Sequence, residues 1–78
     1  MFKLSMLDIN TAAPIFQEMV SAVVLPGEEG ELSILTFHQP IISCLKEGKI
    51  RIDSHAPMMI KGGIAKMQGD ELVVLVEK

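Results

Sequence analysis

Cysteine and aromatic residues are scarce in this 78-residue chain. It contains no Trp, no Tyr and three Phe, and Cys44 is its one cysteine. A disulfide framework needs paired cysteines, and a structural zinc site cannot be built from one Cys and two well-separated His. The sequence therefore predicts no metal centre and no cofactor, and it offers no aromatic platform for stacking single-stranded nucleic acid.

Positive charge and long apolar segments are also missing. The net charge is −3 and the isoelectric point is near 5.2, whereas a nucleic-acid binder presents a basic patch. No segment approaches the ~20 apolar residues of a membrane span. The first eight residues lack the basic head and long apolar run of a signal peptide. We expect no nucleic-acid partner and a reducing, cytosolic setting.

Hydrophobic residues make up 49% of the chain, and the mean hydropathy is +0.38. A disordered segment has low hydrophobicity and high net charge, so the chain is expected to fold, as one domain over residues 1–78. With few aromatics, its core must be aliphatic. The apolar content has two interpretations, a well-packed small core or a surface for a partner.

The hydrophobic pattern has a period of two almost throughout. Phe2, Leu4 and Met6 alternate with Lys3 and Ser5, which is typical of a half-buried strand. The same reasoning predicts strands over 2–6, 15–25, 31–35, 41–45, 49–53, 58–61, 64–67 and 71–76. Short strands separated by turn signals indicate an all-β sandwich or barrel.

One segment admits a second interpretation. A helix over 14–22 would place Pro14 in its first turn, but Val20, Val23 and Val24 favour a strand, so the helix is the weaker prediction. The strongest turn signal is 26–30, with one Pro and two Gly. The Gly62–Gly63 pair lacks the residues of a phosphate loop and predicts a bulge, or a close approach of another backbone, where a strand ends.

No catalytic residue is predicted. His38 follows Phe37 in a connection, and the nearby hydroxyls of Ser33, Thr36 and Ser43 lie in no strained nucleophile turn, so a structural or interface role is favoured. His55 is expected to be exposed in a turn. Cys44 lies in an apolar strand, where a free Cys behaves as a small hydrophobe.

Three acidic residues lie in or directly after the strongest turn signal: Glu28, Glu29 and Glu31. Calcium requires six or more oxygen ligands, and Pro26 and the two glycines supply no side-chain ligand, so a cation site is not indicated. The trio is best interpreted as a solvated turn or as an acidic contact patch.

The segment 25–52 resembles the epsilon subunit of bacterial F-type ATP synthase, the delta subunit of mitochondria. The matching positions are Glu29-Gly30-Glu31-Leu32, His38, Pro40, Gly48 and Arg51, with Gly62-Gly63-Ile64, Leu72–Val76, Leu7-Asp8-Ile9 and Phe16 outside the segment. The chain departs from the pattern at Ser33, where the family has Gly, and at Thr36-Phe37, where it has Pro-Gly. The connection from Arg51 to Gly62 is also shorter than usual.

The resemblance implies a two-sheet β-sandwich of about eight to ten short strands at the foot of the rotating central stalk. The domain would be a non-catalytic subunit that links gamma to the c ring and couples proton flow to ATP synthesis. It would bind no ATP and would lie peripherally on the cytoplasmic face of the bacterial inner membrane. The family's C-terminal helical hairpin is absent from the sequence, so we expect no inhibition by its insertion into the catalytic head.

The resemblance also implies two interfaces. The c ring would be faced by Glu28, Glu29 and Glu31, because its loops carry Arg in many members of the family. The gamma subunit would be faced by Phe37, His38, Pro40, Ile42 and Ser43, with the Phe37 side chain as an apolar anchor. The alternative function, a free-standing β-sandwich that binds a peptide or carbohydrate, is weakened by the absence of Trp and Tyr.

Overall fold

The computed structural model describes residues 1–35, 40–53 and 55–78, and in these ranges every regular element is a strand. The strands are β1 (Phe2–Asp8), β2 (Pro14–Val20), β3 (Ala22–Gly27), β4 (Gly30–Leu35), β5 (Ile41–Leu45), β6 (Gly48–Ile52), β7 (Met58–Ile60), β8 (Gly62–Gln68) and β9 (Glu71–Glu77). The all-β prediction is confirmed. The alternative helix over 14–22 is wrong, because β2 pairs antiparallel with β1 along most of that range.

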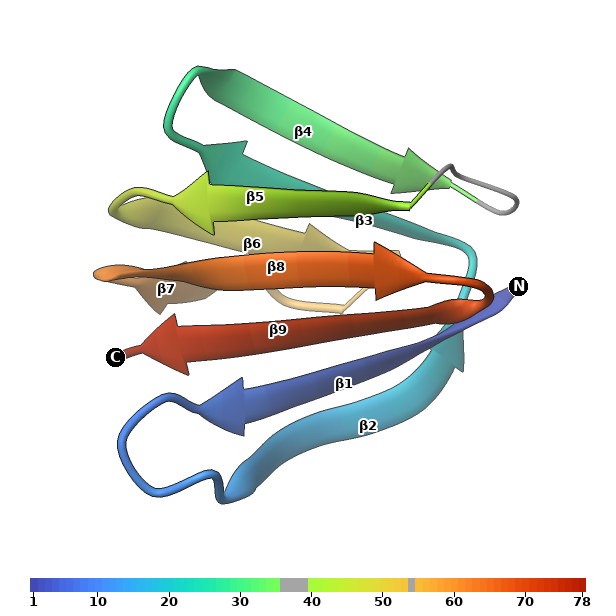
Figure 1. Ribbon diagram of the computed structural model, residues 1–78, viewed down its shortest axis with the longest axis horizontal. Helices are drawn as coiled ribbons and strands as arrows, with labels where there is room; N and C mark the ends of the chain where they lie inside the picture. The colour runs from blue at the N-terminus through green and yellow to red at the C-terminus, as the bar shows by residue number, and fades with distance from the viewer. Residues whose placement is uncertain (36–39, 54) are drawn as a thin grey trace.

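The nine strands form one hydrogen-bonded sheet that folds over into two layers. The strand order is β2-β1-β9-β8-β5-β3-β6-β7, and β4 pairs with β3 alone among the described residues. In Figure 1 the strands β2, β1, β9, β8 and β5 form the front layer, β3, β6 and β7 lie behind it, and β4 forms the upper rim. The predicted two-layer sandwich is therefore confirmed.

A short connection joins the two layers. Gly27 of β3 pairs with Leu45 of β5, and this is the one paired position between these strands. On either side of it, the Glu28 N–H donates to the Cys44 carbonyl over 3.1 Å and the Lys46 N–H donates to the Pro26 carbonyl over 2.8 Å. The end of β5 is thereby fixed to the end of β3, and elsewhere the layers contact each other through side chains.

The core lies between the layers and is aliphatic, as predicted. Because side chains alternate along a strand, each strand sends every second residue inward. The fully or nearly fully buried apolar residues are Phe2, Leu4, Met6, Val20, Val23, Leu25, Ile34, Leu45, Ile50, Ile52, Ile60, Ala65, Met67, Leu72, Val74 and Val76. Phe2 is the one aromatic residue among them, and Phe16 packs against this core while partly exposed.

The glycine pair 62–63 begins strand β8, directly after the connection from β7. Both residues belong to β8, and Gly63 pairs with Val76 of β9. A Cβ atom at Gly63 would collide with the backbone carbonyl oxygen of Leu75. The predicted close approach of another backbone is therefore confirmed. So is the end of the preceding strand, because β7 ends at Ile60, whereas the next strand begins at Gly62 and not at residue 64 as predicted.

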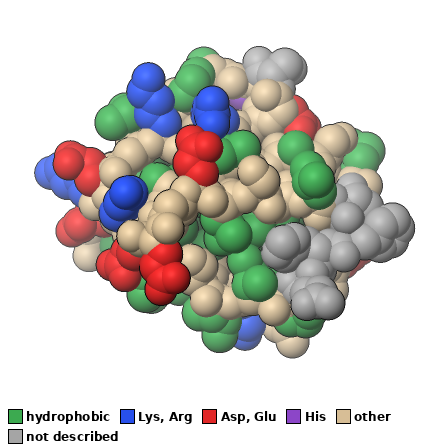
Figure 2. Space-filling model, turned by 90° about the horizontal axis from the view of Figure 1, so that it is seen from above, with side chains coloured by type: hydrophobic (Ala, Val, Ile, Leu, Met, Phe, Trp, Pro, Cys, Tyr) green, Lys and Arg blue, Asp and Glu red, His purple; other side chains and the backbone are tan. Residues whose placement is uncertain are grey.

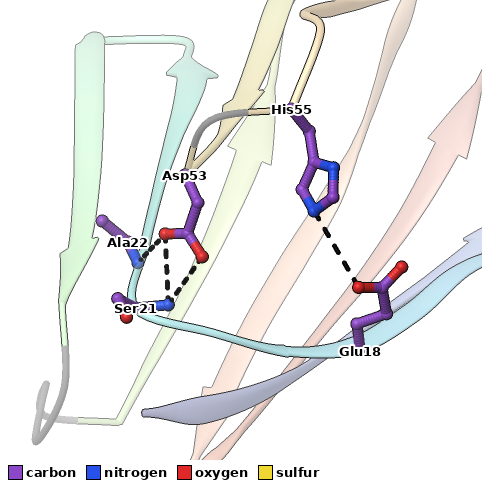
Figure 3. A network of polar contacts seen from close by, with 5 residues as sticks. All are labelled: Glu18, Ser21, Ala22, Asp53 and His55. Carbon is purple, nitrogen blue, oxygen red and sulfur yellow. Dashed lines mark hydrogen bonds and ion pairs between the residues drawn. The ribbon is translucent and has the colours of Figure 1, made fainter.

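The expected single stretch over 15–25 is two strands, divided at Ser21. Here the chain leaves the front layer as β2 and enters the other layer as β3 (Figure 1). The Asp53 carboxylate accepts hydrogen bonds from the Ser21 N–H at 3.0 Å and the Ala22 N–H at 2.7 Å (Figure 3). Asp53 itself has a left-handed φ of 43°. A carboxylate from the end of β6 thus satisfies the backbone donors that the crossover exposes.

The same connection reaches β2 through His55, which is exposed as predicted. Its Nε2 lies 3.9 Å from Oε1 of Glu18, and its ring meets Phe16 edge to face with the centroids 5.2 Å apart (Figure 3 shows the ion pair). Both side chains of the ion pair are about half exposed, so the pair contributes little to stability. The segment after β6 therefore contacts both strands that flank the crossover.

Candidate partner-binding surfaces

The acidic trio occupies the tip of the β3–β4 hairpin. β3 extends through Gly27 and β4 begins at Gly30, so the turn consists of Glu28 and Glu29 alone and is shorter than the predicted 26–30. The residues on either side of the turn, Gly27 and Gly30, must lack a side chain or adopt an unusual backbone conformation. Gly30 has a φ of 132°, and a Cβ at Gly27 would lie 2.7 Å from the Gly30 carbonyl oxygen. These glycines allow the turn to present both carboxylates to solvent.

Glu31 differs from its two neighbours because it has a charged partner. Its Oε2 accepts a hydrogen bond from Nη2 of Arg51 over 3.0 Å, across the intervening strand β3. Both side chains are more than half exposed, so solvent screens the pair. Glu28 and Glu29 have no ion-pair partner among the described residues. Of the trio, these two carry the charge that is available to a partner.

A groove of about 490 Å³ begins beside this tip. One wall is the run Gly27–Leu32, and the other is Ile42–Cys44 of β5. Figure 2, which looks down on this side of the molecule, shows acidic side chains at one end, with Lys and Arg side chains among them, and hydrophobic side chains towards the middle. The groove thus joins an acidic end to an apolar wall, which suits a partner that carries both positive charge and apolar side chains.

The structure places the residues predicted to face gamma at two neighbouring hollows, and two of them lie outside the described residues. Ile42 is 74% exposed on β5, and with Ser43 it lines the groove beside the acidic tip. Pro40 is exposed and lines a second hollow of about 440 Å³ with Ile42 and the β8 residues 66–68. Phe37 and His38 lie outside the described residues. The two predicted interfaces therefore meet at one groove, which the sequence pattern did not reveal.

The outer face of the front layer carries an apolar row that the sequence analysis missed. Cys44 pairs with Ile64, Ile64 with Leu75, and Leu75 with Leu7, so one row crosses four adjacent strands. The Ile64 side chain is 41% exposed. The available signal was β9 itself, where Leu72–Val76 is apolar at every position and so offers an apolar side chain to both faces of the sheet.

Cys44 lies in an apolar strand, as predicted, but on its outer face. Its thiol is exposed, because the alternation of β5 turns Leu45 inward and Cys44 outward. In the part of the chain that the structure describes, no three His, Cys, Asp or Glu side chains are grouped to hold a metal ion. Nor is any helix within the described ranges long and apolar enough to cross a membrane.

The carboxylate of Asp8 has a structural role. Asp8 ends β1, and its carboxylate accepts hydrogen bonds from the N–H groups of Asn10 at 2.8 Å and Thr11 at 3.1 Å. These bonds favour the charged form and hold the pKa of Asp8 below its ordinary value. The arrangement caps the β1–β2 turn.

Comparison with known proteins places this fold and hairpin in a family. Residues 3–78 match the family model for the β-sandwich domain of the ATP synthase delta/epsilon chain. The chain belongs to the ATP synthase delta/epsilon family. The chloroplastic ATP synthase epsilon chain of Pylaiella littoralis is 38% identical over 76 residues, which cover 90% of this chain and 58% of that relative. The ATP synthase epsilon chain of Campylobacter concisus is 38% identical over 81 residues, 99% of this chain and 63% of the relative.

This family member thus spans between half and two thirds of the length of these relatives. Solved structures agree on the fold. A chain in the central stalk/c-ring structure of the Tetrahymena thermophila mitochondrial ATP synthase superposes with a TM-score of 0.83 at 13% identity, covering 97% of this chain and 63% of its own length. A chain of the Euglena gracilis mitochondrial ATP synthase gives 0.82 at 21% identity, covering 96% and 49%. The delta/epsilon sandwich is the architecture that all these chains share.

Proposed function

We propose that this domain is a non-catalytic element of the rotor of an F-type ATP synthase, where it links the gamma subunit to the ring of c subunits and couples proton flow to ATP synthesis. The observation that carries the proposal is the family match over residues 3–78. The comparisons support this reading and give no support to the alternative, a free-standing module for a peptide or carbohydrate. The domain then lies at the cytoplasmic face of the bacterial inner membrane, peripheral to it.

The acidic hairpin tip is the part of the surface that we assign to the c ring. Glu28 and Glu29 are exposed at the end of a tight turn that is anchored to β5 by the bond from the Glu28 N–H to the Cys44 carbonyl. An anchored turn presents its charges at a fixed position, which lowers the entropic cost of binding. Two carboxylates there complement the Arg side chains that c-subunit loops of the family carry.

The apolar wall of the groove is assigned to gamma. Ile42 is the most exposed large hydrophobic residue of the described chain, and Ser43 and Pro40 lie beside it. Interfaces bury apolar side chains at their centre and leave polar ones at the rim, so Ile42 is the expected centre of this contact. Phe37 and His38, which the family resemblance adds to this interface, remain part of the proposal on that ground alone.

A binding experiment tests the proposal. The chain is tagged and added to detergent-solubilised ATP synthase from which the native epsilon subunit has been removed, and the captured gamma and c subunits are quantified. We expect both to be captured at low salt. The variant Glu29→Lys should lower c-ring capture by about fivefold and leave gamma capture unchanged, because a rim charge is reversed.

The matched control is Asp70→Lys, which makes the same change of charge in the exposed β8–β9 turn, at the opposite end of the molecule from the acidic tip (Figure 1). It should leave the capture of both subunits as in the unmodified chain. Failure to capture either subunit would refute the proposed function. Equal loss with both variants would show that net charge, and not the hairpin tip, controls binding to the c ring.

A further inference from the structure

Three strands lie at open edges of the sheet, and they differ in how well those edges are protected. Among the described residues, β2 pairs only with β1, β7 only with β6, and β4 only with β3. An open edge offers unpaired N–H and C=O groups to any other extended chain. Proteins usually block such edges with proline, charge, irregular pairing or shortness.

Two of the three edges show these devices. β2 begins with Pro14, and its pairing with β1 shifts register between Met6 and Leu7. β7 is three residues long. β4 has six residues in unbroken register with β3 and contains neither Pro nor Lys. Its one charged residue, Glu31, forms an ion pair with Arg51, with 3.0 Å between Oε2 and Nη2. β4 is therefore the least protected edge.

The pairing of β3 with β4 identifies which backbone groups are free. In a hairpin with a two-residue turn, the flanking pair exchanges hydrogen bonds, and bonded and non-bonded pairs then alternate. Gly27–Gly30 is the flanking pair here, so Glu31, Ser33 and Leu35 direct their N–H and C=O groups away from β3. The hydrogen bonds on the opposite edge of β3 are consistent with this alternation. There the carbonyls of Ala22 and Pro26 accept hydrogen bonds from the N–H groups of Asp53 and Lys46.

We propose that the β4 edge pairs with the β4 edge of a second copy of this chain, antiparallel and about a two-fold axis at Ser33. In that register Ser33 faces Ser33 of the second copy, and Glu31 faces its Leu35. All three outward-facing residues are then bonded, and no like charges stand opposite each other, which would destabilise the pair. The arrangement also covers the Leu35 side chain, which is 57% exposed.

A second copy fits this edge better than a strand of arbitrary sequence because the edge is complementary to itself. An isologous contact of this kind closes after two copies and does not propagate. One pair of short strands buries less than the ~1,200 Å² of a standard stable interface, so the dimer is weak and forms at high chain concentration. The inference does not rest on the proposed function.

Sedimentation equilibrium of the chain, from micromolar to millimolar concentration, tests the proposal. We expect a reversible monomer–dimer equilibrium, with the amide protons of Glu31, Ser33 and Leu35 protected from exchange as the concentration rises. Ser33→Lys places two positive charges across the axis and should weaken association by about tenfold or more. The matched control, Gln17→Lys on the other long edge strand, β2, should associate as the unmodified chain does.

The thermal unfolding midpoint of each variant checks that it is folded. Should Ser33→Lys unfold, Ser33→Glu repeats the test with charges of the opposite sign. A chain that stays monomeric at millimolar concentration overturns the proposal. So does a dimer that Gln17→Lys weakens as much as Ser33→Lys does, or one that protects the amides of β2 or β7 instead of β4.

Discussion

The outer faces of the two layers have opposite chemical character. On the front layer, Cys44, Ile64, Leu75 and Leu7 form a continuous apolar row across four strands. On the other layer, β6 turns Lys49 and Arg51 outward, and Arg51 forms an ion pair with Glu31 of β4. A sheet face that carries charge is suited to water, whereas an apolar row is suited to contact. The two layers therefore share one core and differ in what they can meet outside.

Strand β9 carries apolar residues on both its core face and its outer face, so it can test how far the outer apolar row differs from the core. Leu72→Ala removes a fully buried side chain from the core and should lower the free energy of unfolding by about 2–5 kcal/mol. Leu75→Ala truncates the same residue type on the outer face, where it is partly exposed, and should cost at most about 1 kcal/mol. Urea unfolding followed by circular dichroism measures both. Equal losses would mean that the outer row is covered and acts as a second core.

The alternation along the strands was enough to predict the layers and most of the core. Ile50 and Ile52 alternate with Lys49 and Arg51, and this short-range pattern assigns each side chain to a face without knowledge of the partner strands. The strand break at Ser21 was not predictable in this way. It depends on Asp53, thirty-two residues away in sequence, whose carboxylate caps the crossover.

The junction between the layers can be weakened without touching either face. Asp53→Ala removes the acceptor for the N–H groups of Ser21 and Ala22 and puts Ala at a left-handed φ, so unfolding should become easier by about 1–2 kcal/mol. Asp53→Asn keeps one acceptor oxygen and tolerates the same φ, so it should lose less than half as much. The two variants are compared by thermal unfolding. Identical losses would show that backbone conformation has no part in the effect.

The smallest expected effect on stability comes from the ion pair on the charged outer face. A double-mutant cycle on Glu31→Gln and Arg51→Gln should give a coupling free energy between 0 and about 1 kcal/mol that decreases as salt is added, because both side chains are exposed. Repeating the cycle in high salt separates the charge interaction from packing. A coupling that is large and unaffected by salt would mean that this pair is shielded from water, and the contrast between the two outer faces would then disappear.

The candidate site could be predicted only in part, because one side of it depends on pairing between strands that are distant in sequence. The sequence alone indicates that Glu28 and Glu29 are exposed, because a turn signal surrounds them. It does not indicate that Ile42 and Ser43 lie across a groove from them, because that depends on the pairing of β3 with β5 at Gly27 and Leu45. Nor does it indicate that Cys44 is exposed, since the apolar composition of 41–45 conceals which face each residue takes.

The parallel pairing of β1 with β9 has a kinetic consequence. Lys3 to Asp8 align with Glu71 to Val76, so the first strand of the sandwich is bonded to its ninth. Until β9 has been synthesised, β1 and β2 can form only a two-stranded hairpin, which is marginal in water. The inward side chains of β1 are therefore exposed until β9 has been synthesised. Long-range closure of this kind slows folding, and it makes the final strand the step at which the front layer is completed.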